Sequence, residues 1–130
     1  MPRARRRTAG SAPALLAALA LATLLASCAA PACRNAIARR VPSPDSQSDA
    51  VVFQRDCGGQ AGASTDVAIV PHDADLPDMP TPVLTLGQSV SVTATWSSAS
   101  ELVLAYPASA SVVGKMARSP EGVSVRLEPR

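Results

Sequence analysis

Hydrophobic and polar residues alternate with a period of two along several short stretches of this chain. The clearest stretch is Ser89–Ser97, in which Val90, Val92, Ala94 and Trp96 alternate with serines and threonines. Such alternation predicts a β-strand with one face buried and the other face in water. The pattern therefore places a half-buried strand in the second half of the chain.

Shorter runs of the same kind predict the other strands. They are Ala50–Cys57, Asp66–Val70, Val83–Leu86 as a short edge strand, Glu101–Tyr106 and Gly122–Glu128. We interpret Ser109–Met116 as a further strand, although its pattern is ambiguous. Cys33–Val41 is too short to distinguish one helical turn from irregular structure. We therefore expect five or six short strands.

Two of these strands are predicted to form a β-hairpin in the middle of the chain. Within Val51–Val70, a small-residue loop at Gly58–Thr65 separates two strand-like runs, the first of which ends in Cys57. The four prolines of Pro71–Pro82 exclude a helix or a central strand from the next segment. The whole pattern predicts an all-β domain over residues 33–130, a small antiparallel meander or sandwich.

The first 27 residues have the features of a bacterial lipoprotein signal peptide. Met1–Gly10 carries four arginines, and the apolar run Ala12–Ala26 is about as long as the hydrophobic region of a signal peptide. Leu25-Ala26-Ser27-Cys28 then has the form of a lipobox, in which the cysteine thiol receives diacylglycerol. We expect a cleaved signal helix at 1–27, a lipid on Cys28 and a short tether at 28–32.

Two alternatives to lipidation remain open for this segment. Ordinary secretory cleavage near Ala30 or Ala32 would leave a mature chain without lipid. An uncleaved membrane anchor would need a longer apolar run. The lipoprotein prediction places the chain in the bacterial cell envelope, with the membrane as a partner through Cys28. Ala29 is not an aspartate-type inner-membrane retention signal, which favours the periplasmic face of the outer membrane.

Removal of the signal peptide reverses the sign of the net charge. The whole chain has twelve basic and ten acidic residues, but four of the basic ones (Arg3, Arg5, Arg6 and Arg7) precede residue 28. The remaining eight basic residues against ten acidic ones give a net charge of −2. No broad basic surface is expected, so we predict no nucleic-acid partner.

Cys33 and Cys57 remain as a pair once Cys28 is lipidated. In an oxidising compartment, an even pair predicts a disulfide, here closing a loop of about 25 residues worth roughly 3 to 4 kcal/mol. Two free thiols, or a metal site with His72, are the alternatives. Cys33 lies five positions after Cys28, at most about 17 Å of extended chain, so a bridge would hold the domain close to the bilayer.

The candidate chemistry of the chain is sparse. Arg55 and Asp56, with Gly58 and Gly59, form a candidate binding loop at the hairpin tip, but a salt bridge and turn geometry explain them as well. His72 begins an acidic stretch that can hold a metal or a base, and a polar surface loop is the simpler interpretation. No serine lies in a catalytic motif. We expect no catalytic residue, no cofactor and no metal.

Ser43–Ile69 resembles a family of small, uncharacterised bacterial lipoproteins. Their pattern of an early cysteine, S-P-D-G, V-x-F-x-R-D-C-G and S-T-x-V-x-I corresponds here to Cys33, Ser43–Ser46, Val51–Gly58 and Ser64–Ile69. Ser46 departs from the family's glycine, and Gly59-Gln60-Ala61 replaces a threonine-rich loop. The resemblance implies an envelope lipoprotein and supports the pairing of Cys33 with Cys57. It brings no activity, because none is assigned to the family.

These observations favour a lipid-anchored envelope protein whose domain is a non-catalytic binding or structural module, with another envelope protein as a candidate partner. The alternative is a protein inhibitor of an envelope hydrolase, which would present Gly58–Thr65 to an active site. A weak enzyme that uses His72 is a third hypothesis.

Overall fold

The computed structural model describes residues 32–60 and 62–130, and within them the fold is all-β with no helix. The predicted signal helix, Cys28 and the tether up to residue 31 lie outside the described residues. The eight strands of the described part are β1 (Arg34–Pro42), β2 (Ser48–Asp56), β3 (Ser64–Pro71), β4 (Pro82–Leu86), β5 (Thr93–Ser98), β6 (Glu101–Tyr106), β7 (Val112–Lys115) and β8 (Ser124–Pro129). The predicted fold class is thus confirmed.

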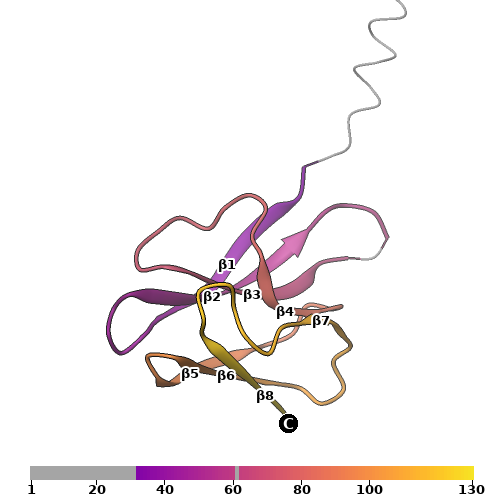
Figure 1. The fold of residues 1–130 in the computed structure, drawn as a ribbon. Coiled ribbons are helices and arrows are strands. Elements are labelled where there is room, and N and C mark those ends of the chain that lie inside the picture. The colour runs from indigo at the N-terminus through magenta and orange to yellow at the C-terminus, as the bar shows by residue number, and fades with distance from the viewer. Residues whose placement is uncertain (1–31, 61) are drawn as a thin grey trace, which may run out of the picture. The chain divides into compact units, whose positions relative to one another are not determined.

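The strands form two sheets, which lie one above the other in Figure 1. Five strands in the order β1-β2-β3-β4-β7 form an antiparallel sheet, and β5-β6-β8 form the second. In the second sheet β6 pairs with β8 in parallel. The chain leaves β6, adds β7 to the other sheet and returns beside β6, because parallel neighbours need a crossover connection.

Two details differ from the expected meander or sandwich of five or six antiparallel strands: the described residues form eight strands, and one pair of neighbours is parallel. Alternation identifies a strand but not its neighbour, so nothing in the pattern marked the parallel pair. Val83–Leu86 was expected at an edge, yet β4 lies between β3 and β7. The strand predicted over Ser89–Ser97 begins only at Thr93.

Cys33–Val41, which the sequence left undecided between one helical turn and irregular structure, belongs almost entirely to strand β1. It pairs antiparallel with β2 from Arg34 opposite Asp56 to Pro42 opposite Asp49, with a bulge between Ile37 and Arg39. As an edge strand it is mostly exposed, so its residues are not selected for alternating hydrophobicity. Its strand character comes from pairing with β2, which a local pattern does not reveal.

The hydrophobic core has two parts. Between the sheets, residues such as Val52, Val67, Leu84 and Leu104 are almost completely buried. A second cluster on the outer face of the larger sheet contains Val51, Phe53, Ala68 and Val70, with Leu76 of the following loop packed against it. Strands β2 and β3 are thus covered on both faces, which explains their continuous rather than alternating apolar runs.

The predicted disulfide between Cys33 and Cys57 is present. It joins the residue before β1 to the residue after β2, at the end of the sheet where Arg34 lies opposite Asp56.

Among the described residues, no helix is long and apolar enough to cross a membrane. The predicted β2–β3 hairpin is also confirmed, with antiparallel pairing from Ser48–Pro71 to Arg55–Ser64.

Candidate functional site

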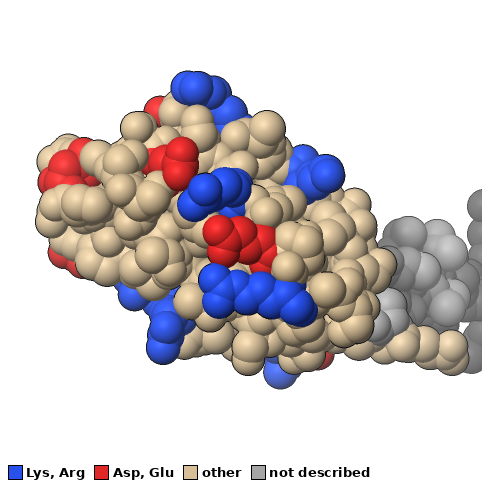
Figure 2. Space-filling view, turned by 90° about the horizontal axis from the view of Figure 1, so that it is seen from below, with Lys and Arg blue, Asp and Glu red and all other residues tan. Residues whose placement is uncertain are grey.

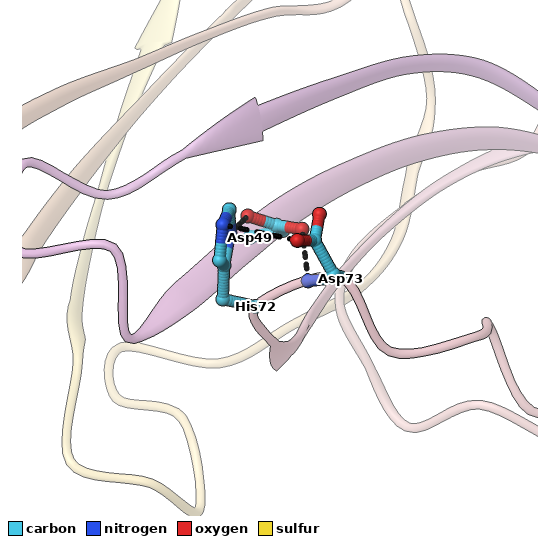
Figure 3. Close-up of side chains that lie close together, drawn as sticks. All are labelled: Asp49, His72 and Asp73. Carbon is cyan, nitrogen blue, oxygen red and sulfur yellow. Dashed lines mark hydrogen bonds and ion pairs between the residues drawn. The ribbon is translucent and has the colours of Figure 1, made fainter.

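The structure brings together one histidine and two aspartates at one end of the β2–β3 pair (Figure 3). Asp49 is the second residue of β2, and His72 and Asp73 directly follow β3. Because Ser48 pairs with Pro71, the two strand ends meet and the side chains converge. Nδ1 of His72 lies 2.8 Å from Oδ1 of Asp49, and its Nε2 lies 3.3 Å from Oδ2 of Asp73.

Asp49 is the centre of this cluster. Its side chain is completely buried, and Oδ2 accepts hydrogen bonds from Nη1 of Arg40 at 2.9 Å and from the backbone N–H of Asp73 at 3.0 Å. Nη2 of Arg40 also donates to the carbonyl of Ala74 at 2.9 Å. The buried carboxylate thus fastens the loop after β3 to strands β1 and β2, and each of its oxygens has a partner.

The same contacts shift the pKa values of both partners. Burial alone would raise the pKa of Asp49, but the hydrogen bonds from His72, Arg40 and the Asp73 backbone outweigh it and lower the pKa to about 2. The hydrogen bond to Asp49 raises the pKa of His72, opposed by desolvation and by Arg40 and assisted by the charges of Asp73 and Asp49. The cluster favours an imidazolium between two carboxylates.

This cluster does not fit a metal site, although its three ligand atoms lie within 4.8 Å of one another. Arg40 places a positive charge 2.9 Å from the only carboxylate of this cluster that is buried, where a cation would be repelled. A metal-binding histidine must also be neutral, and here the raised pKa favours its charged form. The arrangement serves as an ion-pair clamp.

Nor does the cluster contain the parts of a catalytic site. Within residues 32–60 and 62–130, no hydroxyl or thiol makes a hydrogen bond to the His72 ring, whose partners are Asp49 and Asp73. The loop that begins at His72 lies at the surface, as expected, and the buried carboxylate of Asp49 holds its first residues in place. Asp49 was not among the site residues predicted from the sequence. Its only signal is an acidic residue at the start of a strongly apolar run.

The four residues of the candidate binding loop do not converge on one point. Nη1 of Arg55 donates to Oδ1 of Asn35 at 2.9 Å and to the carbonyl of Asp78 at 3.1 Å. Oδ1 of Asp56 instead accepts from the backbone N–H of Gly58 at 2.9 Å. The salt bridge offered as the simpler explanation of Arg55 and Asp56 is wrong, since neither makes an ion pair in the described part of the chain.

Turn geometry accounts for the two glycines of this loop. Gly58 and Gly59 have φ values of 77° and 84°, in the left-handed region that favours glycine. Both are exposed, and the N–H of Gly58 is already bonded to Asp56. An anion site at these glycines therefore has no support from the geometry.

Lys and Arg side chains lie beside Asp and Glu side chains on the face shown in Figure 2. Among the ion pairs of the described residues, Arg126 lies 3.7 Å from Glu128 and 4.0 Å from Glu101, and Arg130 lies 3.0 Å from Glu128. Exposed pairs of this kind are worth at most about 1 kcal/mol each. This face therefore offers no single-sign surface to a charged partner.

Comparisons with family models, with curated proteins and with solved structures found no match to this chain.

Proposed function

We propose that this chain is a lipid-anchored protein of the bacterial cell envelope, whose all-β domain is a non-catalytic binding or structural module at the membrane surface. One observation carries the proposal. The disulfide between Cys33 and Cys57 begins five residues after the lipobox cysteine, Cys28. Disulfides persist in oxidising compartments, and this one uses both cysteines other than the one that lipidation requires.

The position of the disulfide also fixes which end of the domain would lie near the bilayer. Five residues span at most about 17 Å, so the start of β1 and the β2–β3 connection would lie close to the headgroups. Arg39 and Arg40 lie six and seven residues beyond Cys33, roughly 20 and 23 Å along a strand, and Arg40 is bound to Asp49. Of the arginines in β1, Arg34 is therefore the one suited to contact lipid.

The non-catalytic part of the proposal is supported by the state of His72. Both ring nitrogens face carboxylates, and the ring's pKa is raised rather than poised for proton transfer. The hydrolase-inhibitor alternative is supported less well. Gly58–Thr65 lies at the end of the domain that the anchor would hold near the membrane, so only an enzyme at that surface could receive it.

Mass spectrometry of the mature protein tests the proposal. We expect a chain that begins at Cys28, carries acyl lipid and gains the mass of two hydrogen atoms on reduction. Cys28→Ser should abolish the acyl mass and keep the disulfide, and Cys33→Ser should do the reverse. A chain that retains Met1, carries no acyl mass and has three freely alkylated sulfurs would overturn the proposal. Capture of one hydrolase that is lost on deletion of residues 59–63 would favour the inhibitor instead.

A further inference from the structure

A buried carboxylate of strand β3 lacks a partner for one of its oxygens. Asp66 is 2% exposed, and Oγ of Ser64 donates to its Oδ2 at 3.1 Å. Its Oδ1 is buried and has no hydrogen-bond partner among the described residues. Leaving a buried acceptor unpaired is unfavourable, and more so for a charged group. Such an atom points to a ligand that donates a hydrogen bond.

Asp66 lines a cavity of about 280 Å³ on the outer face of the larger sheet. One side of the cavity is formed by strand residues of that face, since Asp66 pairs with Phe53 and Thr85 in neighbouring strands. The cavity is also lined by Met79 and Pro80 of the loop before β4 and by Pro82, the first residue of β4. The volume is below the roughly 300 to 1,000 Å³ typical of pockets for drug-sized molecules, so the cavity suits one small group.

The polar atoms of the cavity suit a primary ammonium. The unpaired Oδ1 of Asp66 and the hydroxyl oxygens of Ser64 and Thr85 are three acceptors, and an alkylammonium carries three N–H donors. Thr85 is partly exposed and lines the cavity, and within the described residues no side-chain hydrogen bond involves its hydroxyl, so this oxygen can accept one. One carboxylate and two hydroxyls are too few for Ca²⁺, which takes six to eight oxygens.

The rest of the cavity suits an aliphatic stem. Pro80 and Pro82 provide an apolar wall, and such walls accommodate the methylene groups of long amines. Met79 is 85% exposed, so packing does not fix its side chain, which can move aside to admit a ligand to Asp66. Arg55 also lines the cavity, but its Nη1 is bonded to Asn35 and Asp78 rather than to Asp66.

We infer that this cavity, with Asp66, Ser64 and Thr85, binds a primary alkylammonium group, either a lysine side chain of a partner or a free amine. The inference does not depend on the lipid anchor. Its failure would leave the expected mass spectrum unchanged, and an unexpected mass spectrum would leave amine binding intact.

Two-dimensional ¹⁵N–¹H NMR of the mature protein in detergent, titrated with n-butylammonium chloride, tests this inference. We expect saturable shifts of the Ser64, Asp66 and Thr85 amides. n-Butanol lacks the charge, and tetramethylammonium lacks the N–H donors, so neither should reproduce them. Acetyl-lysine methylamide distinguishes the sources: tighter binding than n-butylammonium favours a partner's lysine, and weaker binding favours a free amine.

Two charge variants with opposite expected effects make the test sharp. Asp66→Asn should weaken n-butylammonium binding roughly tenfold or more, the value of a charged hydrogen bond. Arg55→Gln should strengthen it by removing a like charge from the cavity. Asp75→Asn removes an exposed carboxylate elsewhere and should change nothing. If Asp66→Asn does not fold, Thr85→Val provides the loss-of-binding variant.

Three results would overturn the inference. The first is the absence of saturable shifts at millimolar n-butylammonium. The second is equal shifts with n-butanol or tetramethylammonium. The third is shifts that persist in the folded Asp66→Asn or Thr85→Val variant, or that follow exposed acidic residues instead of the cavity.

Discussion

Asp49 and His72 lie 23 positions apart in the sequence, yet Oδ1 of the first is 2.8 Å from Nδ1 of the second. The contact joins the start of β2 to the loop that follows β3. Asp49 is fully buried, whereas the side chain of His72 is 36% exposed, so the pair connects the interior of the domain to its surface. The outer cluster around Phe53 lies beneath the same loop, through Leu76. The ion pair therefore keeps the loop after β3 packed against the outer hydrophobic cluster.

Stability should depend on pH through both members of this pair. The pKa of His72 is raised in the fold above its ordinary 6.5, so its contribution is complete below about pH 6.5 and is lost as pH rises through the folded pKa. The pKa of Asp49 is lowered from 3.8 to about 2, so its contribution is present above about pH 3.8 and is lost as pH falls toward 2. Maximum stability from this pair is expected between these limits.

Thermal unfolding as a function of pH measures both effects. His72→Gln should remove the loss of thermal stability at alkaline pH that the pair causes, and it should leave the loss at acid pH in place. Since His72 is the only histidine of the chain, one NMR titration of its ring gives the folded pKa without ambiguity. A folded pKa at or below 6.5 would contradict the prediction.

Removing the buried carboxylate should be strongly destabilising. Asp49→Ala leaves Arg40, the His72 ring and the Asp73 backbone N–H without their acceptor. Loss of one partner of a buried, hydrogen-bonded charge costs about 3 kcal/mol or more. Urea denaturation should therefore show a lower midpoint, while Asp75→Ala, at an exposed carboxylate, should stay within about 0.5 kcal/mol of the parent. Equal stability of the two variants would show that the clamp contributes little.

Local pattern was sufficient for part of this fold. Glu101–Tyr106 forms a strand over the predicted residues, and Leu102, Leu104 and Tyr106, which were expected on one face, pack in the core. β1 was missed because its exposed residues depend on β2 for their conformation. The parallel partner of β6 was missed because β8 is joined to it through a crossover that contains β7. Pairing is a non-local property, and period-two alternation reports only burial.

The candidate sites show the same division. The disulfide was predictable on the expectation that Cys28 is lipidated, which leaves Cys33 and Cys57 as a pair. The clamp at Asp49 and the cavity at Asp66 were not predictable, since each combines side chains from strands and loops that are distant in sequence. His72 was noticed as the only histidine, but its acidic neighbours in sequence did not reveal the buried aspartate that binds it.

The disulfide should contribute much of the domain's stability. It closes a loop with a sequence separation of 24, which the chain-entropy model values at roughly 3 kcal/mol or more. Reduction, or the double variant Cys33→Ser/Cys57→Ser, should lower the free energy of unfolding by that amount in urea. The reduced wild type is the control for packing effects of serine. A loss below about 1 kcal/mol would mean that pairing of β1 with β2 already restrains these ends.

Two backbone positions should respond to substitution with opposite signs. Ser46 adopts φ 54° in the β1–β2 turn, a left-handed conformation that costs a residue with a Cβ about 1 to 2 kcal/mol. Glycine relieves that strain but adds about 0.5 to 1 kcal/mol of unfolded-state entropy, so Ser46→Gly should gain roughly 0.5 kcal/mol. Gly59→Ala, at φ 84° with nothing within 4 Å of an added Cβ, introduces the same strain, offset in part by the lower entropy of the unfolded chain, so it should lose roughly 0.5 kcal/mol. Urea denaturation measures both changes. A destabilised Ser46→Gly would indicate that the Ser46 side chain makes a compensating contact, because the backbone term alone has the other sign.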